Sequence, residues 1–235
     1  MTKIFCAIDT PDLSRAISLS GEISKAGCGI KLGLEFFSSL GNSGVQSIRN
    51  AYPDIPIFLD LKFHDIPNTV VGALKAVTRL GVSYLNVHAS GGAEMMRSGA
   101  EAVFEEADKS GLIAPKLLAV TVLTSMDQKA LSSVGQNEDT VGQVLRLAKL
   151  TKESGLAGVV CSGREISFLR QELGQDFVFM VPGIRPAGSE AGDQKRVLTP
   201  KVALELGATH LVIGRPITQA DDPYQAACDI LSSLV

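Results

Sequence analysis

The 235-residue sequence contains no apolar run that approaches the length of a membrane-spanning helix. Its first residues, Met1 to Asp9, are too short and too soon charged for a signal peptide, so we expect a cytoplasmic protein. Linkers, low-complexity tracts and charge runs are also missing, which favours a single domain over residues 1–235. The formal charge is only −3, which argues against a nucleic-acid-binding surface. Any anionic ligand must therefore be bound by a local cationic site.

Cysteine is scarce, and its four positions are widely separated: Cys6, Cys28, Cys161 and Cys228. The first three lie in apolar, strand-like runs. A disulfide or a zinc site would favour closer pairs, so we interpret these cysteines as small buried apolar residues in a reducing compartment.

Eight short apolar segments alternate with helical ones along the chain. The expected strands are Ile4–Ile8, Cys28–Gly33, Ile55–Leu61, Val82–Val87, Leu117–Val122, Ala157–Cys161, Phe177–Val181 and His210–Ile213. They are apolar throughout, which is typical of parallel strands covered on both faces. This pattern predicts an α/β fold, a (β/α)8 TIM barrel. An open doubly wound sheet is the alternative, but no G-x-G-x-x-G follows the first strand.

Helices are expected between these strands and after the last one. They span Ser14–Lys25, a stretch after Gly33, Thr69–Leu80 with Asn68 as its cap, a stretch through Lys109, Gln128–Ser133, Thr140–Ser154, Glu165–Leu173, Pro200–Leu206 and a final helix from Pro223.

Charged residues gather at the end of the third expected strand. Asp60 and Lys62 are two residues apart and share a face of a strand, and Asp65 follows where the chain turns. Buried charges are costly unless they are paired, so a cluster on a core strand is a candidate active site. A purely structural ion-pair network is the alternative interpretation.

Polar residues also follow most of the other strands, at the end where barrel enzymes hold their active sites. They are Asp9, Lys31, His88, Thr124, Ser125, Pro182, Arg185, Gly214 and Arg215. His210 begins its strand instead, so we expect it to be structural. Gly214 and Arg215 have the form of a barrel phosphate site, and the long loop 183–194 has the composition of a lid that brings Arg185 or Gln194 to the phosphate. A surface ion pair and a loop without a role are the alternatives.

The Asp60-x-Lys62-x-x-Asp65 pattern resembles the orotidine 5'-phosphate decarboxylase family, and the resemblance runs end to end. It also rests on Asp9, Lys31, Thr124-Ser125, the Pro182–Pro186 loop and Gly214-Arg215. The resemblance implies the loss of CO2 from orotidine 5'-phosphate to give uridine 5'-phosphate, the last step of pyrimidine nucleotide synthesis. It also implies a homodimer and a reaction without metal or organic cofactor.

The resemblance further implies a role for each site residue. Lys31, Asp60, Lys62 and Asp65 would form an alternating charge array, with Asp65, Ile66 and Thr69 contributed across the dimer interface. Asp9 and Lys31 would hold the ribose, Ser125 the pyrimidine, and Arg185, Gln194, Gly214 and Arg215 the phosphate. Pro182 and Thr124 belong to the same site, with Thr121 as an alternative to Thr124. His64 and His88 would support the site without direct catalysis.

Three other functions stay open. Magnesium-dependent sugar-phosphate decarboxylases and aldolases share the Asp-x-Lys-x-x-Asp pattern but use a glutamate on the second strand, where this chain has the cationic Lys31. A Schiff-base aldolase would need Lys62 as a neutral amine, which flanking carboxylates disfavour. A nucleotide-phosphate binder without catalysis is the third alternative.

Overall fold

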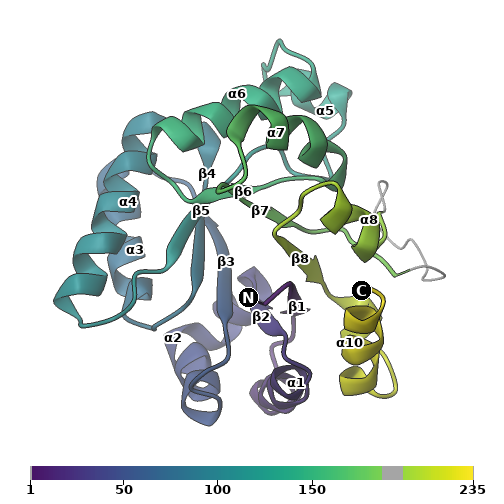
Figure 1. The fold of residues 1–235 in the computed structure, drawn as a ribbon. Helices are drawn as coiled ribbons and strands as arrows, with labels where there is room; N and C mark the ends of the chain where they lie inside the picture. Colours follow the sequence, from purple (N-terminus) through teal and green to yellow (C-terminus); the bar gives the residue numbers. More distant parts are fainter. Residues whose placement is uncertain (1, 187–197, 235) are drawn as a thin grey trace.

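The computed structural model describes residues 2–186 and 198–234, and its centre is a closed barrel of parallel strands (Figure 1). Neighbouring strands pair in sequence order, and β8 returns to pair with β1. The strands are β1 (Ile4–Ile8), β2 (Gly29–Leu32), β3 (Ile57–Phe63), β4 (Tyr84–His88), β5 (Lys116–Val120), β6 (Gly158–Val160), β7 (Val178–Val181) and β8 (His210–Ile213). The single-domain (β/α)8 barrel is confirmed.

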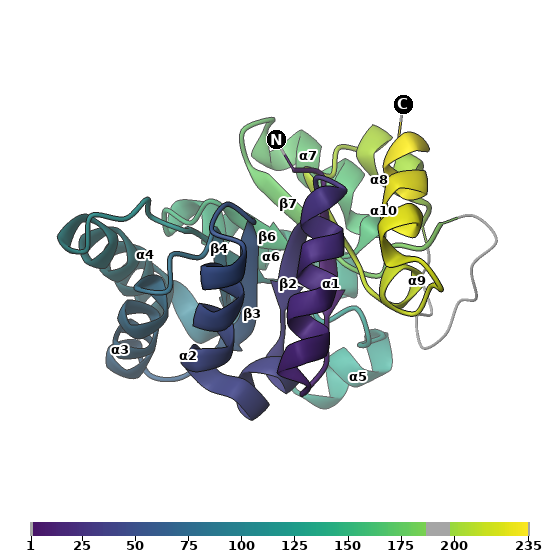
Figure 2. The same cartoon turned by 90° about the horizontal axis from the view of Figure 1, so that it is seen from below.

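Helices surround the barrel on its outside (Figure 1). The α-helices are α1 (Leu13–Lys25), α2 (Leu34–Ala51), α3 (Pro67–Thr78), α4 (Gly92–Lys109), α5 (Gln128–Ser133), α6 (Thr140–Glu153), α7 (Ile166–Leu173), α8 (Pro200–Glu205), α9 (Arg215–Thr218) and α10 (Pro223–Ser232). Short 3-10 turns, η1 (Ala89–Gly91) and η2 (Gly163–Glu165), precede α4 and α7. The last helix, α10, packs beside α1, so the first and last helices of the sequence lie side by side on the outside of the barrel (Figure 2). Within the described ranges, no helix is both long and apolar enough to cross a membrane.

One expectation about the helices was wrong, and one short helix was missed. Asn68 does not cap α3, because the helix already begins at Pro67 and Ile66 holds the cap position. Proline suits the first helical position because its φ is fixed and its missing N–H needs no partner. The short helix α9, directly after Gly214, was not expected from the sequence.

The strands are apolar because both of their faces are buried. Phe5, Phe58 and Tyr84 point into the barrel and pack edge to face with one another. The alternate residues of β1, such as Cys6, pack against the surrounding helices. Cys28 and Cys161 are buried as well, and burial raises the pKa of all three thiols, as expected of small apolar core residues.

His210 is a core residue at the N-terminal end of the barrel. Its Nε2 lies 2.8 Å from the hydroxyl of Tyr84, and its Nδ1 lies 2.8 Å from the carbonyl oxygen of Thr2. Burial lowers the pKa of His210, which favours the neutral imidazole. Both ring nitrogens therefore hold structural contacts, and the prediction of a structural role is confirmed.

Candidate active site

A cavity of about 330 Å³ opens at the C-terminal ends of the strands, where a barrel enzyme holds its active site. Its polar walls are built from most of the residues selected in the sequence: Asp9, Lys31, Asp60, Lys62, Thr124, Pro182, Arg185, Gly214 and Arg215. Its apolar walls include Ala7, Phe58, Val120, Val160 and Val212. The cavity thus combines an apolar floor with charged groups contributed by several strands.

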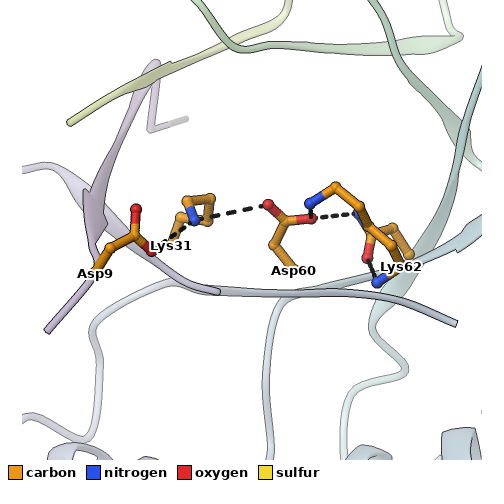
Figure 3. Close-up of polar contacts among 5 residues, drawn as sticks. Asp9, Lys31, Asp60 and Lys62 are labelled. Carbon is orange, nitrogen blue, oxygen red and sulfur yellow. Dashed lines mark hydrogen bonds and ion pairs between the residues drawn. The ribbon is translucent and has the colours of Figure 1, made fainter. Parts of the chain in front are cut away.

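Four charged side chains that line the cavity form a row, as Figure 3 shows. The ammonium of Lys31 lies 3.1 Å from Asp9 Oδ1 and 3.7 Å from Asp60 Oδ2. The ammonium of Lys62 lies 2.6 Å from the other oxygen of Asp60, Oδ1. The Asp60 carboxylate therefore lies between two lysines, and the signs alternate along the row. We call Asp9, Lys31, Asp60 and Lys62 the charge row.

Asp60 remains ionised although its side chain is only 12% exposed. Burial by itself would raise the pKa of Asp60, but the charges of Lys31 and Lys62 oppose it. Hydrogen bonds from Lys62 and from the amide of Asn86 also favour the carboxylate, and the net effect lowers the pKa. The cavity therefore holds a preorganised negative charge between two positive ones.

Lys62 reaches Asp60 through an irregular segment of β3. Its φ of 52° is the only positive φ at a non-glycine residue in the described part of the chain. The pairing of β3 with β4 shifts at the same place, between Leu59 and Phe63. Backbone strain of this kind is common at functional sites. Asp60 and Lys62 do meet, as the alternation of a strand predicted, but the backbone between them is not regular.

Gly33 and Asn86 are two parts of the site that the sequence reasoning missed. A Cβ atom at Gly33 would lie 2.7 Å from Lys31 Nζ and 2.8 Å from Asp9 Oδ1, so a larger residue would displace one or both ends of that ion pair. Asn86 is fully buried and hydrogen-bonds both Asp60 and Lys62. Its signal in the sequence was a polar residue inside the apolar run of β4.

Asp65, Ile66 and Thr69 lie on the surface and do not line the cavity of their own chain. The carboxylate of Asp65 accepts a hydrogen bond from the backbone N–H of Ile66 at 2.6 Å. No ion pair joins it to Lys62 among the residues that the structure describes. Ile66 is 66% exposed, which is unusual for so large an apolar side chain at the edge of a site.

The threonines near β5 differ in their environment. Thr124 lines the cavity, whereas the buried Thr121 hydroxyl points to the carbonyl oxygen of Val160. This arrangement favours Thr124 over Thr121 as a ligand contact. Ser125 is exposed and is not part of the cavity wall. Gln194 falls outside the described residues.

His64 and His88 lie together near the charge row, with ring centroids 5.4 Å apart. Burial, the neighbouring His64 and the ammonium of Lys62 lower the pKa of His88, while Asp60 opposes them. A neutral His88 adds no further positive charge beside Lys62. Neither ring lines the cavity.

Comparisons with known proteins find relatives over nearly the whole chain. The sequence model of the family described as "Orotidine 5'-phosphate decarboxylase / HUMPS family" matches residues 2–230. The chain is 49% identical to the orotidine 5'-phosphate decarboxylase of Paramagnetospirillum magneticum, over 100% of this chain and 99% of the relative. It is 51% identical to that of Rhodospirillum rubrum, over 99% and 94%. A crystal structure of orotidine 5'-phosphate decarboxylase from Lactobacillus acidophilus matches with a TM-score of 0.86 and 35% identity, covering 100% and 99% of the two chains.

Proposed function

Since the chain belongs to the orotidine 5'-phosphate decarboxylase / HUMPS family, we propose that it converts orotidine 5'-phosphate to uridine 5'-phosphate and CO2. The reaction proceeds without metal or organic cofactor, as the last step of pyrimidine nucleotide synthesis in the cytoplasm. The observation that carries the proposal is the charge row along the cavity wall, in which two lysines flank the buried carboxylate of Asp60.

Lys62 is the central catalytic residue of the proposed reaction. Loss of CO2 leaves a carbanion on the pyrimidine ring with no adjacent π system to delocalise it. The ammonium of Lys62, held 2.6 Å from Asp60, is a fixed positive charge at the place where negative charge develops. Preorganised charge of this kind is usually the largest single contribution to catalysis. The same ammonium then donates a proton to the carbanion.

Asp60 faces the carboxylate that departs as CO2. Two carboxylates in one cavity repel each other, and that repulsion is relieved as CO2 leaves. Because the pKa of Asp60 is lowered, the carboxylate is charged at neutral pH and the repulsion is present. Lys31 balances Asp60 from the other side, and together with Asp9 it holds the ribose hydroxyls.

Two arginines that follow β7 and β8 give the cavity a cationic lining that suits the substrate phosphate. Arg185 and Arg215 line it beside Gly214, and Arg185 is buried. A guanidinium binds phosphate through two parallel charged hydrogen bonds. In the proposal, Gln194 is a further residue that binds the phosphate. Thr124, Ser125 and Pro182 contact the pyrimidine end of the substrate. Binding energy from the remote phosphate then holds the ring against the charge row.

The proposed active unit is a homodimer in which Asp65, Ile66 and Thr69 of one subunit complete the site of the other. Two observations support this proposal: the three residues lie outside their own cavity, and Ile66 is largely exposed. Asp65 would then extend the alternating charges beyond Lys62 of the partner.

Mixing two inactive variants tests this arrangement. A mixture of Lys62→Ala and Asp65→Asn subunits, refolded together, should regain about a quarter of the wild-type activity, because half of the random dimers contain one intact site of two. Each variant refolded alone is the control. No recovery in a mixture shown to contain mixed dimers would place Asp65 in the site of its own chain.

The alternative functions fit the geometry less well. A magnesium site at the end of β2 would require a carboxylate where Lys31 places an ammonium between Asp9 and Asp60. A Schiff-base mechanism requires a neutral lysine amine, yet Lys62 is ion-paired with Asp60. A binder without catalysis would not need this closely spaced array of charges around the buried carboxylate of Asp60.

The deciding experiment follows the ultraviolet absorbance of orotidine 5'-phosphate in excess chelator. We expect rapid loss of the orotate chromophore with the wild-type protein and near inertness of Lys62→Ala. Lys75→Ala is the matched control, because Lys75 is a lysine of α3 paired with Glu105 outside the cavity. Turnover only after magnesium is restored would support the sugar-phosphate enzymes, and tight binding without turnover would support the silent binder. Trapping of Lys62 by borohydride would support the Schiff-base aldolase.

A further inference from the structure

Asn86, in the middle of β4, contacts the charge row from behind the cavity wall. Its side chain is fully buried and does not line the cavity. Its Oδ1 accepts the backbone N–H of Lys62 at 2.8 Å, and its Nδ2 donates to Asp60 Oδ1 at 2.7 Å. Only this orientation of the amide fits, because a backbone N–H needs an acceptor and a carboxylate needs a donor. One rigid side chain therefore holds both Asp60 and Lys62.

The position of Asn86 coincides with the irregular segment of β3. Leu59 pairs with Leu85 and Phe63 pairs with Val87, so β3 advances four residues where β4 advances two. The segment from Asp60 to Lys62 consequently lies opposite Asn86 alone. Extra residues in one strand disrupt the ladder of backbone hydrogen bonds. The amide of Asn86 accepts the N–H of Lys62 at this point, within the segment where Lys62 adopts its positive φ.

The same amide fixes the orientation of the Asp60 carboxylate, whose two oxygens face different lysines. Oδ1 accepts hydrogen bonds from both Asn86 Nδ2 and Lys62 Nζ, and Oδ2 is left toward Lys31 at 3.7 Å. Turning the plane of the carboxylate away from this orientation would break the hydrogen bond to Asn86. The amide thus fixes the orientation of the charge row without touching the cavity.

We propose that Asn86 is a positioning residue for the decarboxylation, which holds the strained backbone of Lys62 and the carboxylate of Asp60 so that Lys62 Nζ stays aimed at the reacting carbon. This inference rests on the proposed function. A purely structural role would affect folding and leave the turnover of folded protein unchanged. A positioning role lowers turnover and leaves the binding of phosphate and ribose almost intact.

The first test compares Asn86→Ala with a control that loses a buried hydrogen bond elsewhere. Thr151→Val is suitable, because the buried Thr151 hydroxyl donates to the carbonyl oxygen of Leu147 within α6. We expect kcat of Asn86→Ala to fall about 10- to 100-fold, as for loss of hydrogen bonds to charged groups. KM and the dissociation constant of uridine 5'-phosphate should change less than about threefold, because the phosphate and ribose contacts lie elsewhere. A kcat within threefold of that of Thr151→Val would overturn the proposal.

The pH dependence of kcat in Asn86→Asp is a measurement that a purely structural role of Asn86 would not change. The introduced carboxyl keeps an acceptor for Lys62 N–H but places a second carboxylate against Asp60, and such pairs raise one pKa strongly. Once protonated, it again donates to Asp60. We therefore expect kcat of folded Asn86→Asp to rise as the pH is lowered, relative to the wild-type protein at each pH. A constant ratio across the pH range would contradict the proposal.

A crystal structure of Asn86→Ala tests the positioning role of Asn86 independently of the proposed function. If the wild-type protein fails to decarboxylate orotidine 5'-phosphate, the proposed function is wrong, but the geometric claim is still testable. We expect the variant to lose the positive φ of Lys62 or the 2.6 Å contact of Lys62 Nζ with Asp60. A variant that keeps both would show that Asn86 positions neither residue.

Discussion

Replacement of Asp60 by asparagine should destabilise the protein strongly, because it leaves two lysines without their shared partner. Coulomb's law at an effective dielectric constant of about 20 gives an attraction of about 4 kcal/mol for Lys31 at 3.7 Å and about 6 kcal/mol for Lys62 at 2.6 Å. Desolvation of the charges offsets most of this sum. Measured losses of one partner from a buried pair are about 3–5 kcal/mol. We expect Asp60→Asn to lower the free energy of unfolding by about 3 kcal/mol, at the lower end of this range, because Lys62 is 28% exposed and is partly hydrated.

Thermal unfolding followed by circular dichroism measures this effect. For a chain of this size, a loss of about 3 kcal/mol lowers Tm by about 6–12 °C. Asp9→Asn is the matched control, because it also removes a carboxylate from Lys31, but Asp9 is 47% exposed. Exposed pairs contribute about 1 kcal/mol or less, so the control should lose only a few degrees.

The pH dependence of the same measurement has a definite sign. The pKa of Asp60 is lower in the folded protein than its ordinary value of 3.8. The stability from its ionised form is therefore fully present above pH 3.8 and is lost as the pH falls through the lower, folded value. The difference in Tm between the wild-type protein and Asp60→Asn should become smaller only in that acidic pH range. An Asp60→Asn variant as stable as the wild-type protein at pH 7 would refute this reasoning, and would show that desolvation outweighs attraction in the charge row.

Three further predictions concern other parts of the chain. Arg215→Ala should lower kcat/KM for orotidine 5'-phosphate about 10- to 100-fold and hardly change kcat/KM for the nucleoside orotidine. Equal turnover numbers of the wild-type protein for the nucleoside and the nucleotide would exclude a role of the phosphate in catalysis. Gly33→Ala should displace the ion pair of Lys31 with Asp9 and raise KM several-fold, and a crystal structure with that pair intact would contradict the steric argument. The stability of the wild-type protein should decrease as the pH falls below 6.5, because burial lowers the pKa of His210 in the folded state and the unfolded chain takes up the proton first. His210→Gln should weaken this pH dependence of the unfolding free energy, measured by urea titration. An unchanged pH dependence would show that other groups cause it.

The sequence was sufficient for the fold and for bringing most of the selected residues to one cavity. Strands such as Ile4–Ile8 are apolar throughout because they are buried on both faces. This pattern of apolar runs is a local property of the chain. Because parallel strands of a barrel end at one rim, Asp9, Lys31 and Asp60 could be placed together without coordinates. The family resemblance added the expected roles of these residues.

Tertiary structure decided how the site is held. The pairing shift between Leu59 and Phe63 depends on β4, a strand more than 20 residues away along the chain, and no local pattern in β3 encodes it. The contacts of Asn86 with Asp60 and Lys62 arise from the same pairing. The close approach of Gly33 to the ion pair appears only once Lys31 has folded toward Asp9. Sequence determines which side chains reach the rim, because that follows from periodicity, whereas their orientation follows from contacts between distant strands.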